Sequence, residues 1–161
     1  MLLIGFTGKA RSGKDTAADM VDEILHTKGR KLATLAFATK LKKLASEIFE
    51  VPVHKFNNRK EEFNERWGMT HREMLQKFGT DFARDMVDPD FWVKQLHTEY
   101  LYMERIGVNL CLITDVRFDN EAKYIQEKGG IVINITRNMD ISSASLTESE
   151  QKHKSEDGVS R

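Results

Sequence analysis

A glycine-bounded segment near the N-terminus, Gly8-Lys9-Ala10-Arg11-Ser12-Gly13-Lys14-Asp15-Thr16, has residue types and a spacing that suit phosphate binding. It follows the apolar run 1–6 and precedes a run with helical spacing, so the pattern predicts a strand, a loop and a helix. Gly8 and Gly13 permit backbone conformations in which successive N–H groups turn toward phosphate oxygens. The N-terminus of the following helix adds its positive dipole end. Lys14 is then expected to reach the terminal phosphates of a nucleotide.

The segment departs from the usual phosphate-loop pattern at one position. It matches G-x-x-x-x-G-K, but Asp15 stands where Ser or Thr usually contributes a magnesium ligand, and Thr16 follows one position later. The alternative interpretation is a chance glycine turn before a helix. The apolar run before the segment and the amphipathic run after it both favour a phosphate loop.

A second group of candidate residues follows the apolar run 108–114. Such a continuous run is typical of a parallel strand that is buried on both faces. Asp115 stands at its end, on the sheet edge where ligands of open α/β sheets bind, and is therefore a candidate magnesium-organising carboxylate. The alternative is that Asp115 only caps the next helix. Arg117 follows two residues later and has the guanidinium fork that suits phosphate.

The chain between these two groups predicts alternating strands and helices. Residues 17–25 predict a helix that stops at Lys28-Gly29, and 32–38 has the length of a strand. A strand, a helix and a strand in this order predict a right-handed crossover and a parallel sheet. The next helical stripe, 41–49, has lysines at 40, 42 and 43 on its first turns. These cations indicate either an anionic partner or a solvated face.

The segment 50–69 is the least regular part of the sequence. Pro52 breaks the preceding helix, and Asn57-Asn58 is expected to form a turn. Residues 59–67 combine charges with aromatic side chains. The segment is either a mobile flap over a substrate or a solvated connector.

The C-terminal half predicts three further helices and a last strand. Thr70 and Glu73 fit a capping box for a helix that runs to Met86, although Gly79 interrupts it and suggests a packing or binding reason. Asp88-Pro89 predicts the start of a helix buried against the sheet. Asp119-Asn120-Glu121 opens a short helix that ends at Gly129-Gly130, and 131–136 predicts the fourth strand.

Composition narrows the class of protein. The chain has 161 residues, which predicts one domain, and its 25 basic residues balance 25 acidic ones, so no overall field favours nucleic acid or an acidic membrane. Its one cysteine, Cys111, lies in an apolar run and predicts a buried, inert thiol. No apolar run is long enough to cross a membrane, and the first residues predict a strand, not a signal peptide. We therefore expect a soluble protein of a reducing compartment.

Taken together, these pieces resemble the bacteriophage deoxynucleoside monophosphate kinases, a branch of the nucleoside monophosphate kinase-like proteins. The likeness runs through nearly the whole chain, and the order and spacing of the pieces make it specific. It comprises R-S-G-K-D-T within 8–16, Phe37-Ala38-x-x-Leu41-Lys42, Arg59-Lys60-Glu61, Leu75-Gln76-x-x-Gly79-Thr80-Asp81, Phe91-Trp92-Val93, Asp115-x-Arg117-x-x-x-Glu121, Arg137 and His153-x-Ser155-Glu156.

The resemblance implies a three-layer α/β P-loop NTPase fold with a mostly parallel sheet flanked by helices. It implies a single kinase domain over 1–161, with a mobile acceptor flap at 50–69 and a lid at 137–158. The implied activity is ATP-dependent phosphorylation of deoxynucleoside 5′-monophosphates to diphosphates with Mg²⁺. The implied location is the cytoplasm, which is that of the host if a phage encodes the chain. No polymeric nucleic acid or membrane is an implied partner, and the oligomeric state stays open.

The resemblance also implies roles for individual residues. Adenylate-kinase-like loops similarly place a non-hydroxyl residue after the lysine, which makes Asp15 a family feature. Lys14, Asp115 and Arg117 are the implied catalytic residues, and Asp115 and Thr16 the implied magnesium ligands, with water between Thr16 and the ion. The implied ATP-binding residues are Arg11, Ser12, Gly13, Lys14, Asp15, Thr16 and Arg137. The implied acceptor-binding residues are Phe37, Ala38, Lys42, Arg59, Arg72, Gln76, Asp81, Arg117 and Glu121, with Arg84 beside the base; Arg72, Gln76, Asp81 and Arg84 have surface ion pairing as their alternative.

Two other functions compete with this interpretation. One is a small P-loop kinase for a non-nucleotide phosphorylated metabolite. The other is a nucleotide-binding module with little catalysis, because members of the family continue past the H-x-S-E element into a further strand and helix that this sequence lacks.

Overall fold

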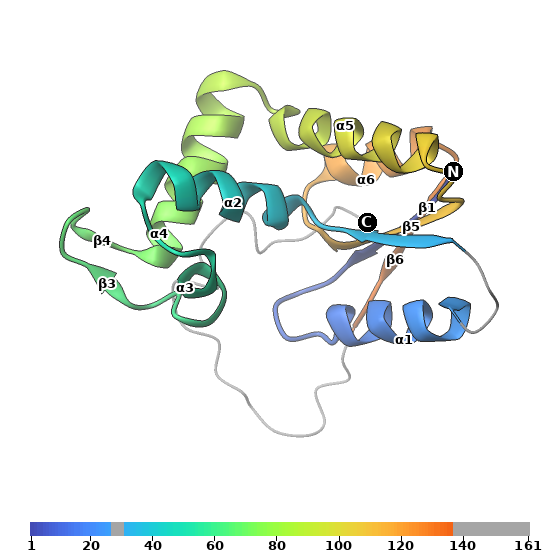
Figure 1. The fold of residues 1–161 in the computed structure, drawn as a ribbon, viewed down its shortest axis with the longest axis horizontal. Coiled ribbons are helices and arrows are strands. Elements are labelled where there is room, and N and C mark those ends of the chain that lie inside the picture. The colour runs from blue at the N-terminus through green and yellow to red at the C-terminus, as the bar shows by residue number, and fades with distance from the viewer. Residues whose placement is uncertain (27–30, 137–161) are drawn as a thin grey trace. The chain divides into compact units, whose positions relative to one another are not determined.

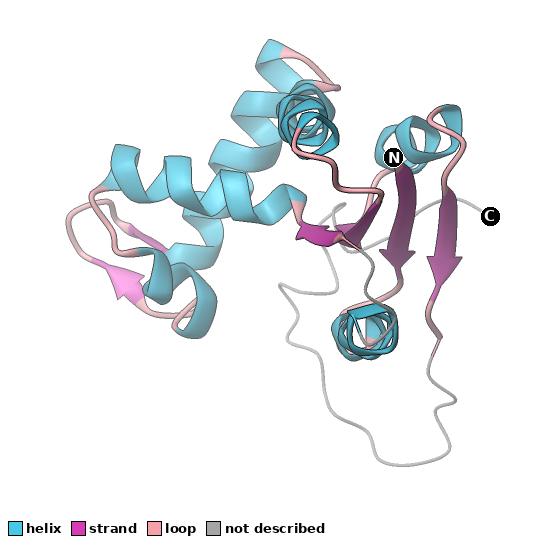
Figure 2. Cartoon of the chain, turned by 45° about the vertical axis from the view of Figure 1, so that its right-hand side comes forward, coloured by secondary structure: helices cyan, strands magenta, loops and turns pink. Residues whose placement is uncertain are grey.

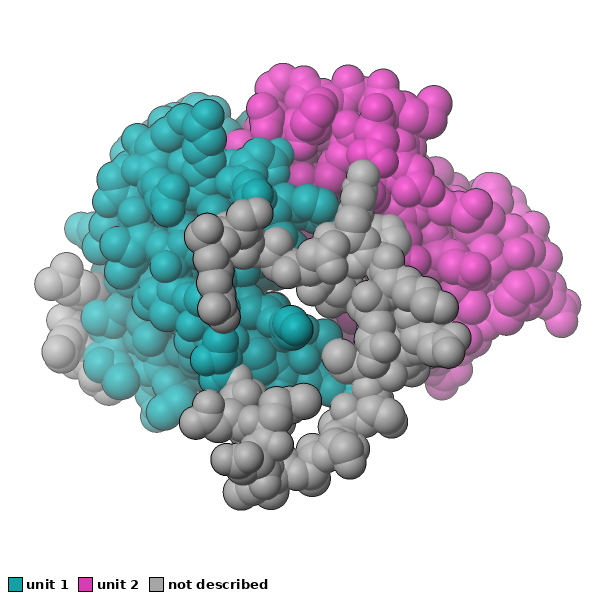
Figure 3. All heavy atoms as spheres, turned by 180° about the vertical axis from the view of Figure 1, so that it is seen from behind, with its two compact units in different colours: residues 1–36, 96–161 teal, residues 37–95 magenta. Residues whose placement is uncertain are grey.

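A computed structural model describes residues 1–26 and 31–136 of the chain. The chain divides into two compact units, which Figure 3 shows in different colours. Unit 1 comprises residues 1–36 and 96–161, and unit 2 comprises residues 37–95.

Unit 1 contains a four-stranded sheet in the order β2-β5-β1-β6 (Figure 1). The central strand β1 (Leu2–Thr7) pairs with β5 (Leu110–Val116) on one side and with β6 (Ile131–Asn134) on the other. Strand β2 (Leu32–Leu35) pairs with the far side of β5. Every one of these pairings is parallel, which confirms the predicted parallel sheet.

Helices cover both faces of this sheet (Figures 1 and 2). On one face, Ala18 of α1 (Lys14–His26) belongs to a buried cluster with Phe6 and Leu112. On the other face, α6 (Asp119–Glu127) packs so closely on β1 that a Cβ at Gly5 would lie 2.7 Å from Ile125 Cδ1. The alternation of Gly5 and Phe6 between the two faces is the period of a strand buried on both sides.

Two predicted strands are longer than the observed ones. The run 32–38 was expected to be a strand throughout, but β2 ends at Leu35 and α2 (Phe37–Phe49) already includes Phe37 and Ala38. Phe37 stands four residues before Leu41 and eight before Ala45, so the helical period extends back to the first residue of α2. Strand β6 is confirmed but ends two residues before the predicted end. The predicted helix stop at Lys28-Gly29 lies outside the described residues.

In unit 2, the segment 50–69 is folded; Val51 and Phe56 are buried, whereas none of residues 59–67 is. Helix α3 (Val53–Asn58) begins after Pro52, and Asn57-Asn58 closes this helix instead of forming the predicted turn. Strands β3 (Phe63–Asn64) and β4 (Met69–Thr70) form an antiparallel hairpin. A buried cluster holds the segment in place; it consists of Ala45, Val51, Phe56 and Met74, with Phe49, Trp67, Met69, Leu75 and Phe78 packed against it.

The predicted capping box is confirmed at the start of α4 (His71–Gln76). The backbone N–H of Glu73 donates to Thr70 Oγ1 at 3.2 Å, and that of Thr70 donates to the Glu73 carboxylate at 2.7 Å. The helix then continues as a π-helix, η1 (Lys77–Val87), which the prediction of one continuous α-helix missed. Apolar spacing does not separate the two helix types over so short a run.

Gly79 has the packing reason that its position in the helix suggested. A Cβ at Gly79 would lie 2.8 Å from Leu41 Cδ2, so the glycine allows η1 to approach α2 closely. The Gly79 carbonyl also accepts a hydrogen bond of 2.7 Å from Trp92 Nε1. Gly79 therefore joins η1 both to α2 and to the start of α5 (Phe91–Arg105).

Helix α5 begins at Phe91, two residues after the predicted first position at Pro89. Asp88 still assists this start, because its Oδ1 accepts the N–H of Asp90 at 2.7 Å. Leu96 and Tyr100 are buried, whereas Leu101 and Tyr102 of the same helix are about half exposed. None of the helices found in residues 1–26 and 31–136 combines the length and apolarity that a membrane span requires.

Cys111 is a buried thiol, as its apolar surroundings in the sequence predicted. It lies in β5 and has no exposed surface. Burial raises the pKa of the Cys111 thiol to about 12. The reactive thiolate is therefore scarce near neutral pH, as expected of an inert thiol, and the predicted burial is confirmed.

The approach of α6 to β1 can be tested at Gly130, where the chain turns from α6 into β6. A Cβ at Gly130 would lie 2.6 Å from the Leu3 carbonyl oxygen, which belongs to the backbone of the central strand. We expect Gly130→Ala to lower the free energy of unfolding by about 1–3 kcal/mol, measured by urea denaturation. The control Gln126→Ala on the exposed surface of α6 should change it by less than about 0.5 kcal/mol. Equal stability of the two variants would contradict the close packing.

Candidate functional site

The predicted phosphate loop lies between β1 and α1 and needs its glycines. Gly8 has φ 149° and Gly13 has φ 95°, both in the range that favours glycine. Arg11 has φ 61°, an uncommon conformation for a residue with a side chain. Such backbone conformations persist where the surrounding structure holds them, and they gather at ligand-binding sites.

The start of the loop is enclosed by backbone and side-chain atoms. A Cβ at Gly8 would lie 2.4 Å from the Ile135 carbonyl oxygen and 2.6 Å from Ser12 Oγ. Ile135 in turn donates its N–H to the Thr7 carbonyl at 2.8 Å. The first residue of the loop is thus held between the ends of β1 and β6, with no room for a side chain.

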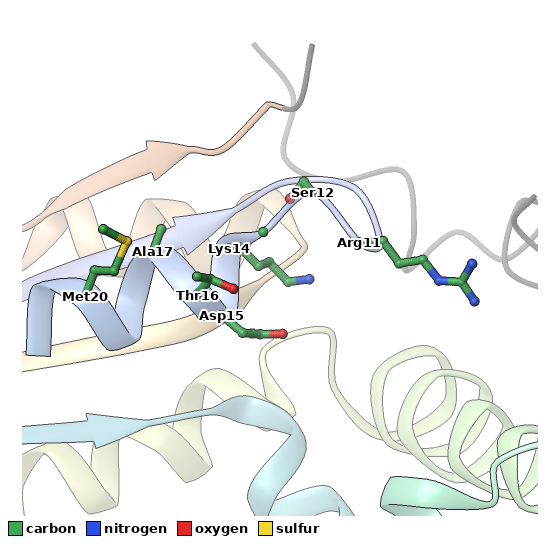
Figure 4. A pocket seen from close by; sticks show the side chains of 8 residues that line it. Arg11, Ser12, Lys14, Asp15, Thr16, Ala17 and Met20 are labelled. Carbon is green, nitrogen blue, oxygen red and sulfur yellow. The ribbon is translucent and has the colours of Figure 1, made fainter. Parts of the chain in front are cut away.

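The loop borders an open cavity of about 500 Å³. Lys14, Asp15 and Thr16 project from the start of α1 toward one side of the loop, whereas Arg11 extends away from them (Figure 4). Only 9% of the Lys14 surface is exposed. The cavity is lined by Arg11, Ser12, Gly13, Lys14, Asp15, Thr16, Ala17 and Met20. The structure thus brings the predicted ATP-binding residues together, apart from Arg137, which lies outside the described residues together with the predicted lid at 137–158.

Two buried hydroxyl groups beside the loop have no hydrogen-bond partner among the described residues. They are Thr7 Oγ1 and Ser12 Oγ. A buried hydroxyl without a partner costs free energy unless a ligand or water satisfies it. The sequence analysis missed Thr7, and its place as the last strand residue before Gly8 was the signal that could have found it.

Asp115 lies on β5, the strand next to β1, and Arg117 is the first residue after β5. Strand β5 runs to Val116, so Asp115 is part of the strand and not the residue after it. After an irregularity in the register, Thr7 pairs with Val116, the residue between Asp115 and Arg117. The N-cap position of α6 is Phe118, so the interpretation of Asp115 as the cap of this helix is wrong. Paired strands lie about 4.8 Å apart, which places the ends of β1 and β5 side by side.

Glu121 holds the backbone that carries Arg117. Only 1% of its surface is exposed, and its Oε2 accepts the N–H of Arg117 at 2.8 Å and that of Phe118 at 3.2 Å. A carboxyl oxygen has lone pairs for two such N–H donors, so one atom fixes both backbone groups. Glu121 therefore supports the Arg117 segment from inside the protein.

The predicted acceptor residues are divided between the two units. Arg117 and Glu121 belong to unit 1, with Lys14 and Asp115. The others belong to unit 2: Phe37, Ala38 and Lys42 lie on α2, Arg59 follows α3, Arg72 and Gln76 lie on α4, and Asp81 and Arg84 lie on η1. Phe37 and Arg84 are buried, whereas Asp81 is exposed.

Two of these arginines contact the same acidic turn in unit 2. Arg59 Nη1 lies 3.2 Å from Glu62 Oε2, and Arg72 Nε lies 2.6 Å from Glu61 Oε1. Lys55 also contacts Glu62, at 2.7 Å, and the hydrogen bonds from Lys55 and Arg59 lower the pKa of the Glu62 carboxyl. The Arg59 side chain is 63% exposed, so its ion pair is weak and can give way to a phosphate.

A search of known proteins gives the family. A family model described as deoxynucleotide monophosphate kinase matches residues 34–161. The chain belongs to this family. Within the family, it is 35% identical over 149 residues to the "Putative deoxynucleotide monophosphate kinase" of Acanthamoeba polyphaga mimivirus, with 85% of this chain and 75% of the relative covered. It is 29% identical over 96 residues to the deoxynucleotide monophosphate kinase of Escherichia phage RB69, with 60% and 36% covered.

Membership in the deoxynucleotide monophosphate kinase family confirms the resemblance and the enzyme class predicted from the sequence. The chain is a phosphotransferase of the class that acts on deoxynucleoside monophosphates, and the alternative of a metabolite kinase is not favoured. The two relatives are viral, in line with the predicted likeness to phage enzymes. The family model begins at residue 34 and does not include the loop 8–16, so the evidence for the phosphate loop is its geometry.

The donor set suits a magnesium ion that arrives with a nucleotide of the kind these kinases use. No group of three or more His, Cys, Asp or Glu side chains gathers into a metal site within the described part of the chain. Mg²⁺ usually keeps several waters and binds one or two carboxylates together with substrate phosphates. The Thr16 hydroxyl at the cavity and the Asp115 carboxyl on β5 are oxygen donors of the type that Mg²⁺ binds.

Gly8 and Gly13 provide a matched pair that tests the enclosed loop. Both have positive φ, but a Cβ at Gly13 meets nothing within 4 Å, whereas one at Gly8 meets backbone. Gly13→Ala should lower the free energy of unfolding by about 1–2 kcal/mol through its backbone conformation alone. Gly8→Ala should lower the free energy of unfolding by about 1–3 kcal/mol more than Gly13→Ala does, because of the steric overlap. It should also weaken ATP binding more than Gly13→Ala does. Urea denaturation and calorimetry measure both effects, and equal losses would contradict the enclosure of Gly8.

Proposed function

We propose that this chain transfers the γ-phosphoryl group of ATP to a deoxynucleoside 5′-monophosphate and releases ADP and the deoxynucleoside diphosphate. Membership in the kinase family supports the class of acceptor. The observation that carries the proposal for the donor is the cavity around Lys14, at a loop with two glycines of positive φ between a strand and a helix. This combination suits the phosphates of a nucleoside triphosphate.

In this proposal, Lys14 and the backbone N–H groups of the loop bind the β- and γ-phosphates. The buried hydroxyls of Thr7 and Ser12 donate hydrogen bonds to phosphate oxygens, which would satisfy both groups. Arg11 and Arg137 add positive charge on the donor side. Mg²⁺ bound with ATP, near Thr16 and Asp115 and partly through water, would neutralise charge on the transferred group.

The acceptor is assigned to the residues that the family resemblance implies. Lys42, Arg59 and Arg117 supply the charge that binds the acceptor phosphate, and guanidiniums do so in a bidentate manner. Arg72, Gln76, Asp81 and Arg84 are assigned to the base of the deoxynucleoside, and Phe37 and Ala38 remain acceptor-binding candidates. We assign the segments 50–69 and 137–158 to closure over acceptor and donor within one kinase domain.

The chemistry needs no covalent intermediate on the protein. An oxygen of the acceptor phosphate attacks the γ-phosphorus while the bond to the β–γ bridging oxygen breaks, and ADP leaves with that oxygen. The transition state spreads negative charge over the transferred group, so positioning and charge neutralisation supply most of the rate enhancement. Lys14 and Arg117 are the protein cations that we assign to this task.

Replacement of Lys14 tests its assigned role. Lys14→Ala should lower kcat by about 10²–10³-fold in an ATP-coupled assay with a mixture of deoxynucleoside monophosphates, because charge stabilisation in the transition state is lost. Thermal unfolding followed by circular dichroism should show an unchanged fold.

Lys123→Ala is the control for loss of a lysine. Lys123 lies exposed on α6, where it contacts Glu127 at 3.8 Å. The control should keep the wild-type kcat. Activity retained by Lys14→Ala would refute the assignment of Lys14.

A further inference from the structure

His71 is a buried polar side chain that the proposed reaction does not use. It is the first residue of α4 and has no exposed surface. Its ring packs edge-on against Phe56, with the centroids 5.7 Å apart. Its Nδ1 lies 2.8 Å from the carbonyl oxygen of Arg59.

The contact with Arg59 fixes the tautomer of His71. A carbonyl oxygen only accepts hydrogen bonds, so Nδ1 carries the proton and donates it. The other nitrogen, Nε2, is buried and has no hydrogen-bond partner among residues 1–26 and 31–136. An apolar side chain would fill this place without leaving a buried nitrogen unpaired. The polar character of His71 therefore has a single visible use, which is the hydrogen bond to Arg59.

This hydrogen bond is part of a set that holds the turn 59–62. The Arg59 carbonyl also accepts the N–H of Glu62 at 3.1 Å, which closes the turn. His71 donates its own N–H to the Glu62 carbonyl at 3.2 Å, and Arg72 donates its N–H to the Lys60 carbonyl at 2.8 Å. The start of α4 is itself fixed by the capping box of Thr70 and Glu73. Hydrogen bonds thus join both ends of the turn to the first turn of α4.

We propose that His71 is a positioning residue for the acceptor. His71 acts by holding the Arg59 backbone through its Nδ1–H. The Arg59 guanidinium is exposed and contacts Glu62, so its place depends on the backbone that carries it. Without the His71 donor, the Arg59 carbonyl keeps the Glu62 contact but loses its link to α4. The inference rests on the proposed role of Arg59 in binding the acceptor phosphate.

The side chains of Asn and Leu, which are nearly equal in shape, provide the test. Asn places an amide N–H near the position of Nδ1, whereas Leu has the same shape and no donor. We expect His71→Asn to keep the KM for the deoxynucleoside monophosphate within about threefold, and His71→Leu to raise it about tenfold, the effect of one lost hydrogen bond. The KM for ATP should stay unchanged in both variants.

A purely structural role would give the reverse order. Leu is apolar and suits a buried site, whereas Asn would bury a second polar group, so Leu would then be tolerated at least as well as Asn. A KM for the acceptor that is equal in the two variants, or higher in His71→Asn, overturns the proposal. If His71→Leu does not fold, His71→Gln is used in its place. The Gln side chain is longer than that of Asn, so its amide lies past the position of Nδ1.

Arg59→Ala separates this inference from the proposed function. It should raise the acceptor KM by itself, and His71→Leu added to it should cause no further rise. Failure of the wild-type chain to phosphorylate any deoxynucleoside monophosphate overturns the proposed function. An unchanged KM in Arg59→Ala overturns the role of Arg59 and, with it, that of His71. A further rise in the double variant overturns the His71 inference alone.

Discussion

The absence of room for a side chain at Gly8 is the constraint on which the candidate site depends. The chain leaves β1 between the Ile135 carbonyl and Ser12 Oγ, and only a glycine can take this path at φ 149°. The turn that follows leads into α1 at Lys14, so the lysine stands at the N-terminus of a helix and beside the cavity. The backbone donors, the helix dipole and the ammonium group then all favour the same anion.

Two buried polar side chains support arginines that we assign to phosphate binding. In unit 1, the Glu121 carboxylate accepts two backbone N–H groups at and after Arg117. In unit 2, the His71 imidazole donates to the carbonyl of Arg59. Glu121 and His71 are both almost fully buried, whereas the Arg59 side chain, whose backbone His71 holds, is largely exposed. A buried polar group that fixes backbone lets an exposed guanidinium meet its ligand at a defined place without being buried itself.

The sequence predicted the features that depend on local chemistry. The glycines of the loop, the capping box of Thr70 and the close approach at Gly79 are such features, because each depends on a few neighbouring residues. It did not predict the hairpin β3–β4, whose strands are too short to show alternation, or the π-helix. The contact between His71 and Arg59 was also missed, because it joins residues 12 apart across a turn. Contacts of this kind follow from tertiary packing, which no local pattern encodes.

The central claim is that the acceptor is a deoxynucleoside monophosphate. The most direct test is a panel in which ATP, Mg²⁺ and the wild-type chain are combined with each of the four deoxynucleoside monophosphates and, separately, with phosphorylated metabolites. We expect a deoxynucleoside diphosphate and ADP to form in equal amounts with at least one nucleotide, and no product to form with the metabolites. Turnover of a metabolite but of none of the nucleotides would contradict the claim, and so would ATP binding without any product.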